Sequence, residues 1–243
     1  MATDWATRLA ARLSTGDALR ISSAMLASVD EVSQHRWEAA KARAATTAGS
    51  LRPEKIDAVT SSFTRELDLE ASAAGAAAAG PVVGTVTTLA SAMAELAWFT
   101  ARAGDLILTI AAIHGRPDPT VEERRAWVLA VLLYGSSARD EFARTLNEAS
   151  IGVAPTVGRQ IPVTTLQVAN RMMSKMFVRR FGTKRGLVAL GRLMPIGLGA
   201  AIGGAANYVT IRTLARHADQ FFARLPYSAI DAVSTDVTGR QLD

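Results

Sequence analysis

Two long stretches of this chain carry no charged residue and are rich in small side chains. The first spans residues 71–94, between Glu70 and Glu95, and the second spans 193–211, between Arg192 and Arg212. Elsewhere apolar residues recur at spacings of three and four, and no run of alternating β-branched residues predicts a strand. The pattern predicts an all-α, single-domain multi-helix bundle with long, hydrophobic, Gly/Ala-rich helices at its centre.

The second stretch, "GRLMPIGLGAAIGGAANYVTIR" at 191–212, has three interpretations. A phosphate-binding glycine loop needs flanking strands, which are not predicted. A free membrane span has the length of about 20 residues, but Gly, Pro and Asn207 dilute its hydrophobicity and basic residues flank both ends. An interfacial hairpin stays open. We favour a closely packed helix after an elbow at Pro195, with the structural glycines Gly197, Gly199, Gly203 and Gly204.

Local signals place the helix ends. Pro53 and Glu54 predict a helix start, Thr120 and Glu123 a capping box, and Gly135 a helix end. Ser136 and Ser137 are interpreted as capping residues. The expected helices cover about 5–13, 17–45, 82–113, 121–134, 136–150, 164–180 and 198–222, with a further helix that starts at about Pro53 and a frayed tail after Pro226. The expected inward residues are Leu19, Met25, Leu26, Val29, Val32, Trp37, Ile56, Val59, Phe63 and Leu67.

Charge is distributed unevenly. Residues 151–220 hold ten basic residues and one acidic residue, and nothing acidic lies between Glu148 and Asp219. Such a block favours a polyanionic partner, unless it pairs with acids of the same chain. The chain has no cysteine, which excludes disulfides and thiolate chemistry. Asp4 and Arg8 interrupt any export signal, so a cytoplasmic location is expected.

The basic helix at 164–180 is amphipathic. Its apolar side is expected to be Leu166, Val168, Ala169, Met172, Met173, Met176 and Phe177. This side either dips into a membrane interface or docks on the protein core, and the sequence does not decide between the two. Nucleic acid is disfavoured because no recognition motif accompanies the charge. The candidate residues for binding a ligand or lipid headgroup are Arg179, Arg180, Lys184, Arg185 and Arg192.

The helix at 82–113 is apolar except for Glu95, Arg102 and Asp105. These three lie near one helical stripe and, with Asn207, are expected to form a buried polar network or a polar headgroup pocket. Glu95 and Asp105 are about 15 Å apart along a helix, too far for a glycosidase-type pair. His35, His114 and His217 are scattered, so we expect no metal site, no cofactor and no catalytic residue.

Part of the chain resembles the EcsC family. Gly191, Pro195, Gly199, Gly203, Gly204 and Asn207 match that family's glycine-rich run, and "ELAWFTARAGDLILTIAAIHGRPDPTVEERRAWVLAVLLYG" is similar to its helix, turn and leucine-rich helix. The resemblance covers roughly residues 75–222 and implies an α-helical, membrane-associated protein without an agreed biochemical activity. The family is named for a bacterial protein encoded beside the subunits of an ABC exporter. On this view 1–50 holds N-terminal amphipathic helices, 51–226 is the EcsC-like domain and 227–243 is a flexible tail.

The sequence thus predicts a non-enzymatic protein at the inner face of the cell membrane that supports transport or envelope processes. The expected partner is an anionic phospholipid membrane or an acyl-chain lipid. Two alternatives stay open. One is a lipid-acting hydrolase that uses Glu95 and Asp105, and the other is an interaction scaffold for an ABC exporter.

Overall fold

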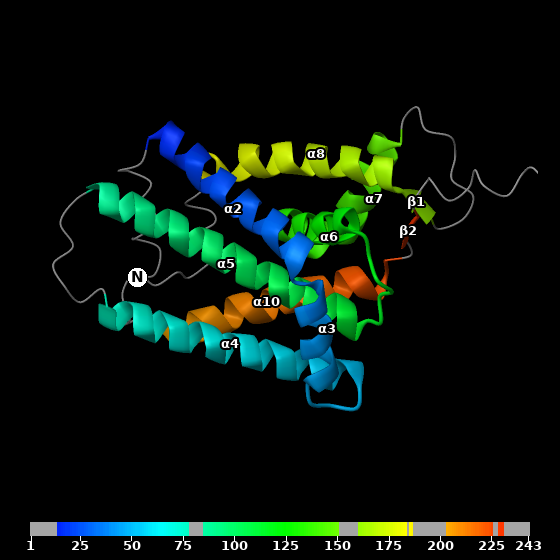
Figure 1. Cartoon of the computed structure of the whole chain (residues 1–243), viewed down its shortest axis with the longest axis horizontal. Coiled ribbons are helices and arrows are strands. Elements are labelled where there is room, and N and C mark those ends of the chain that lie inside the picture. Colours follow the sequence, from blue (N-terminus) through cyan, green and yellow to red (C-terminus); the bar gives the residue numbers. More distant parts are fainter. Residues whose placement is uncertain are drawn as a thin grey trace, which may run out of the picture.

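The computed structural model describes residues 14–77, 85–150, 160–183, 185–186, 203–225 and 228–230. It confirms an all-α multi-helix bundle with a central hydrophobic helix. The helix α5 (Thr85–Ile113) packs against α2, α3, α4, α6 and α10 (Figure 1). These are α2 (Thr15–His35), α3 (Trp37–Thr46), α4 (Arg52–Ala77), α6 (Val121–Tyr134) and α10 (Gly203–Ala223). Between α6 and α10 the chain also forms η1 (Gly135–Ser137), α7 (Ala138–Ala149) and α8 (Val163–Phe181).

Most of the predicted boundary signals are confirmed. Thr120 and Glu123 form a capping box at the start of α6, and Gly135 ends that helix with a φ of +57°. Pro53 lies in the first turn of α4, whose first residue is Arg52. Side-chain oxygens at a helix start satisfy backbone N–H groups that have no partner within the helix, which explains why these short signals are reliable.

The expected single helix over 17–45 is wrong, because the chain bends at Arg36 and forms two helices. Arg36 has φ −102° and ψ 0°, although its N–H still bonds to the carbonyl of Val32. The bend turns Trp37 inward, where its Nε1 donates to Asp118 at 3.0 Å and its ring meets Trp127 edge-on at 6.5 Å. A tertiary contact therefore overrides a continuous helical pattern.

The predicted inward positions are buried with one exception. Met25, Val29, Val32, Trp37 and the four positions on α4 belong to the core, and Leu26 is partly buried against it. Leu19 is instead 44% exposed. Since α2 and α3 pack on α5, the described part of residues 1–50 shares one core with the helices that follow.

Two local predictions between the helices are wrong. The segments expected as loop and frayed tail contain β1 (Gln160–Pro162) and β2 (Ser228–Ile230), which pair in parallel. In such a pair, the backbone N–H and C=O groups of each strand bond to the other strand. Ser136 and Ser137 lie in η1, and Ser137 makes no side-chain cap at the start of α7. Within this turn the backbone N–H of Ala138 instead donates to the carbonyl of Gly135.

Parts of both uncharged stretches lie toward one end of the bundle. The described end of α4 and the starts of α5, α10 and α2 are all on that side of the molecule (Figure 1). We call this the apolar end. The expected helix at 5–13, the break at Gly80-Pro81, and Pro195, Gly197 and Gly199 lie outside the described residues. Gly203 and Gly204 form the first residues of α10.

Candidate functional site

The apolar side of α8 is packed on the core. Leu166, Ala169, Met173 and Phe177 are 0–1% exposed, and α8 contacts α6, α7 and α2. Met172 and Met176 are partly buried against the same core. The structure therefore agrees with the interpretation in which α8 docks on the protein core. Its apolar side is therefore not available to dip between lipids.

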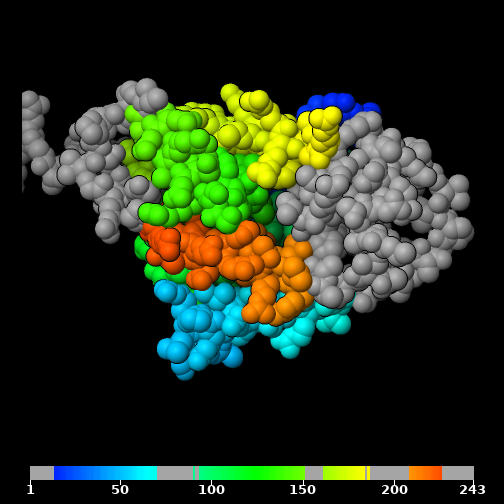
Figure 2. All heavy atoms as spheres, turned by 180° about the vertical axis from the view of Figure 1, so that it is seen from behind, coloured from blue at the N-terminus to red at the C-terminus, as the bar shows by residue number. Residues whose placement is uncertain are grey.

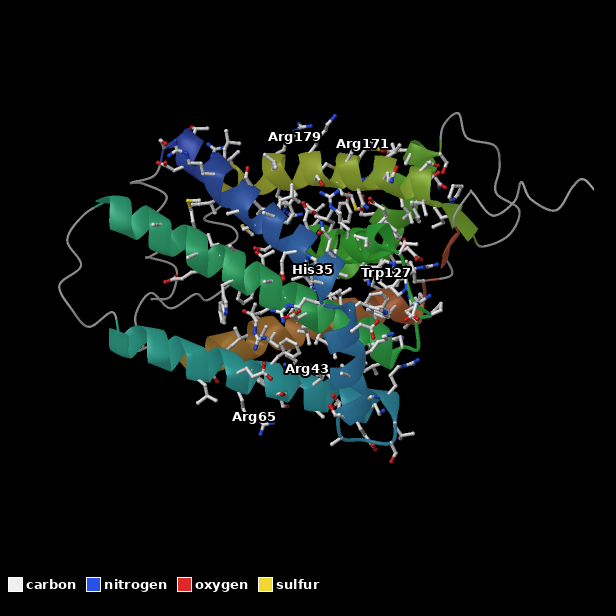
Figure 3. The ribbon with its side chains drawn as sticks, viewed as in Figure 1. His35, Arg43, Arg65, Trp127, Arg171 and Arg179 are labelled. Carbon is white, nitrogen blue, oxygen red and sulfur yellow. The ribbon has the colours of Figure 1, made fainter. Side chains whose placement is uncertain are left out.

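The opposite side of α8 is a row of exposed cations, which we call the α8 row: Arg171, Lys175 and Arg179. Their spacing of four places them on one side of the helix over about 12 Å. Arg171 and Arg179 lie on the outer side of the bundle, whereas Arg65 on α4 lies on the opposite side (Figure 3). In the described part of the chain, no ion pair joins these three side chains to an acidic residue.

The other candidate headgroup residues have different surroundings. Arg180 donates to the carbonyl of Leu133 and lies 5.6 Å from the ring of Phe181, so it secures the end of α6. Arg185 is exposed just after α8. Lys184 and Arg192 lie outside the described residues. The list of candidate headgroup residues included Arg180, which is exposed but bonded to this carbonyl, and left out Arg171 and Lys175, which complete the exposed row.

The end of α8 and the start of α2 form a corner that is both basic and apolar. Leu19 lies against Gly182, where a Cβ would come within 2.9 Å of its Cδ2 atom, and Leu19 is still 44% exposed. The Arg20 side chain beside it is 72% exposed and lies 3.7 Å from the carboxylate of Asp17, which neutralises part of its charge. Because Arg179 is three residues before Gly182, this α2–α8 corner continues the α8 row.

Large apolar side chains are exposed toward the same end. Leu69 lies eight residues before the end of α4, and Tyr208 and Val209 lie in the second turn of α10. They are 71%, 39% and 62% exposed respectively. Trp98, at the middle of α5, is 38% exposed. Exposed apolar side chains that form a patch mark surfaces that contact a partner or a membrane, whereas single ones are common on protein surfaces.

Two of the four predicted network residues, Arg102 and Asp105, belong to a wider set of ion pairs. Arg102 pairs with Glu66 on α4, which also binds Arg43 on α3 through two bonds of 2.6 and 3.3 Å. The guanidinium of Arg43 lies 4.4 Å from the centre of the Phe63 ring. We call Arg43, Glu66, Arg102 and Phe63 the Glu66 cluster. Glu66 was missed, although it lies next to the predicted inward residue Leu67.

The carboxyl groups near this cluster differ in their pKa. Burial raises the pKa of Glu66, but bonds from Arg43 and Ser62 lower it more, and the net value is below that of free glutamate. Burial raises the pKa of Asp105, and Arg36 and Arg102, at 3.8 and 3.7 Å, offset only part of this. Asp105 therefore gains less from its partners than Glu66 does.

Glu95 does not join the network within the described residues. It is half-buried on α5 with no hydrogen bond or ion pair there, and burial raises its pKa to about 7. Asn207 is a residue of α10, but its side chain lies outside the described part. The structure therefore brings together Arg102 and Asp105 and leaves Glu95 apart.

Among the described residues, the helix segment with the length and hydrophobicity of a membrane span is packed as a core helix. Met93–Ile113 is long and apolar enough to cross a bilayer, with a mean hydropathy of 1.4, and 61% of it is buried inside the bundle. It also carries Arg102 and Asp105 in ion pairs. Burial by the other helices accounts for its hydrophobicity.

No family model, no curated protein and no solved structure matches this chain.

Proposed function

We propose that this protein binds the anionic surface of a membrane, without catalysis, through the α8 row and the α2–α8 corner. The observation that carries the proposal is the α8 row itself, three exposed cations without an acidic partner in the described residues. They lie in a segment that has no acid between Glu148 and Asp219. Cations that no acid of the chain neutralises are free to meet phosphate groups.

The charges of the row are sufficient for reversible binding. Each Lys or Arg near an anionic leaflet contributes about 1 kcal/mol, so the row contributes about 3 kcal/mol, and the exposed Arg185 extends it. Binding of this kind weakens as salt rises, because ions screen charges at the surface. The α8 row therefore acts as an electrostatic contact and not as an inserted wedge.

Apolar anchoring would come from the corner and the apolar end. Leu19 lies at the corner, and Leu69, Tyr208 and Val209 lie toward the same end of the bundle. Stable membrane attachment usually combines two weak signals, such as a basic patch and an apolar group. The side chains exposed toward this end supply the second signal without exposing the core.

The resemblance to the EcsC family supports the same location, the inner face of the cell membrane. Association with an ABC exporter stays a prediction from that resemblance. The hydrolase alternative has less support, because Asp105 lies between Arg36 and Arg102 and Glu95 is ten residues away on α5. Two carboxyl groups placed in this way do not face one reacting bond.

The test is sedimentation with vesicles of rising phosphatidylserine content. The variant Arg171→Gln, Lys175→Gln, Arg179→Gln should lose about 3 kcal/mol of binding, or roughly 100-fold in affinity. Its thermal stability should stay close to that of the parent, because exposed substitutions change stability by about 0.5 kcal/mol or less each.

A matched control is available on the opposite side of the bundle. Arg52→Gln, Lys55→Gln, Arg65→Gln removes the same charge from α4, where Glu54, Asp57 and Asp68 surround these cations along the helix. This control should keep nearly full binding. Equal losses in both variants would show that only net charge matters and would refute the assigned surface.

A further inference from the structure

A second polar site lies far from the apolar end. A cavity of about 220 Å³ opens between the start of α7 and the second half of α10, which lie side by side on the face seen in Figure 2. Ser136, Arg139, Asp140, His217, Gln220 and Arg224 are among its lining residues. His217 and Arg224 are fourteen and twenty-one residues beyond Gly203, so the cavity is about 20–30 Å from the start of α10.

Positive charge and hydrogen-bond donors dominate the lining. Arg139 is half-exposed and lies 3.6 Å from Asp140, which neutralises part of its charge. Arg224 is exposed and has no acidic partner within the described part of the chain. Two guanidinium groups thus face one carboxylate, and the cavity keeps a net positive charge.

The histidine in this lining is held close to a backbone turn. The ring of His217 lies so near Gly135 that a Cβ there would be 3.2 Å from its Nδ1 atom, and Gly135 also needs its φ of +57°. His217 makes no hydrogen bond or ion pair within the described residues. A bound molecule can therefore use a ring nitrogen without displacing a protein partner.

We propose that this cavity binds the phosphomonoester group of a small ligand. Guanidinium groups bind phosphate oxygens through paired, charge-assisted bonds, and the cavity is lined by Arg139 of α7 and by Arg224, which directly follows α10. The volume is below the roughly 300–1,000 Å³ of pockets for drug-sized ligands, which favours a small molecule. Because the cavity is remote from the α2–α8 corner, the expected source is a soluble phosphomonoester and not a headgroup of the bound membrane.

The experiment is a titration of the full chain with inorganic phosphate and, separately, with glycerol 3-phosphate at constant ionic strength. Binding is followed by calorimetry and by the ring NMR signals of His217, which His217→Gln identifies. Burial and Arg216 lower the pKa of His217 in the free protein, and a bound phosphate should raise it. Both ligands should saturate, and Arg224→Gln or Arg139→Gln should each weaken binding by about tenfold.

The control variant is Arg144→Gln, which removes the same charge from α7 at a residue that pairs with Glu141. It should bind phosphate as the parent protein does. Equal affinity in all variants, or equal displacement of the His217 signals by chloride, would overturn the site. Saturation only by vesicles of phosphatidic acid would overturn the soluble source and assign the cavity to a lipid headgroup.

Discussion

The Glu66 cluster and the α8 row contain the same kinds of cationic side chain in opposite surroundings. Arg43 and Arg102 converge on Glu66 between three helices, and both lie over the ring of Phe63. The three cations of the α8 row point to solvent with no acidic partner among the described residues. The first arrangement joins helices, while the second leaves charge for an external partner. Partner geometry, and not residue type, separates the two roles.

The largest expected effect comes from removing the Glu66 carboxylate, which Arg43 and Arg102 share. Glu66→Gln should lower the free energy of unfolding by about 2 kcal/mol at pH 7, less than a fully buried pair costs because Glu66 is 30% exposed. Vesicle binding should not change. Denaturant unfolding measures the first quantity and sedimentation the second.

The sign of the pH dependence follows from the lowered pKa of Glu66. Its contribution is present above the ordinary glutamate pKa and is lost as the pH falls through the lower folded value, so the two proteins should converge in acid. Asp105→Asn is the matched control, because the pKa of Asp105 is raised and its charged form is less stabilised. If Asp105→Asn lowered the free energy of unfolding as much as Glu66→Gln does, the distinction between the two carboxylates would be contradicted.

A second change tests the same contrast by placing an acidic residue next to the α8 row. Gln167 is exposed one turn before Arg171, so Gln167→Glu should form an i,i+4 pair and reduce affinity for anionic vesicles about fivefold, or about 1 kcal/mol. The gain in stability should be only about 0.3–0.5 kcal/mol. Unchanged vesicle affinity across a salt series would argue against the α8 row as the contact surface.

The smallest expected effect concerns Glu95, an acidic group with no partner in the described residues. Its folded pKa of about 7 exceeds the ordinary value, so its charge destabilises the fold progressively as the pH rises from about 4.5 through 7. Glu95→Gln should therefore raise Tm by about 2–4 °C at pH 8, which corresponds to about 1 kcal/mol after allowance for solvent screening. At pH 4 the two proteins should melt together, and a constant difference at all pH values would exclude titration as the cause.

Local sequence signals were sufficient for much of the fold because they act within a few residues. The capping box at Thr120, the helix end at Gly135 and the inward face of α4 at Ile56, Val59 and Phe63 all follow from short-range chemistry. The bend at Arg36 did not follow, because its benefit lies in contacts of Trp37 with Asp118 and Trp127, 81 and 90 residues away. Pairing of β1 with β2 is equally non-local.

For the candidate surfaces, the sequence by itself determined that a long segment of the chain is basic and that one helix in it is amphipathic. Only the tertiary structure decided that the apolar side of α8 is already covered, that Arg180 binds a carbonyl, and that Arg171, Lys175 and Arg179 remain exposed. Helical periodicity fixes which residues share a side, but it does not specify what packs against that side. That choice depends on which other helices bury their apolar surface there, and so on the whole bundle.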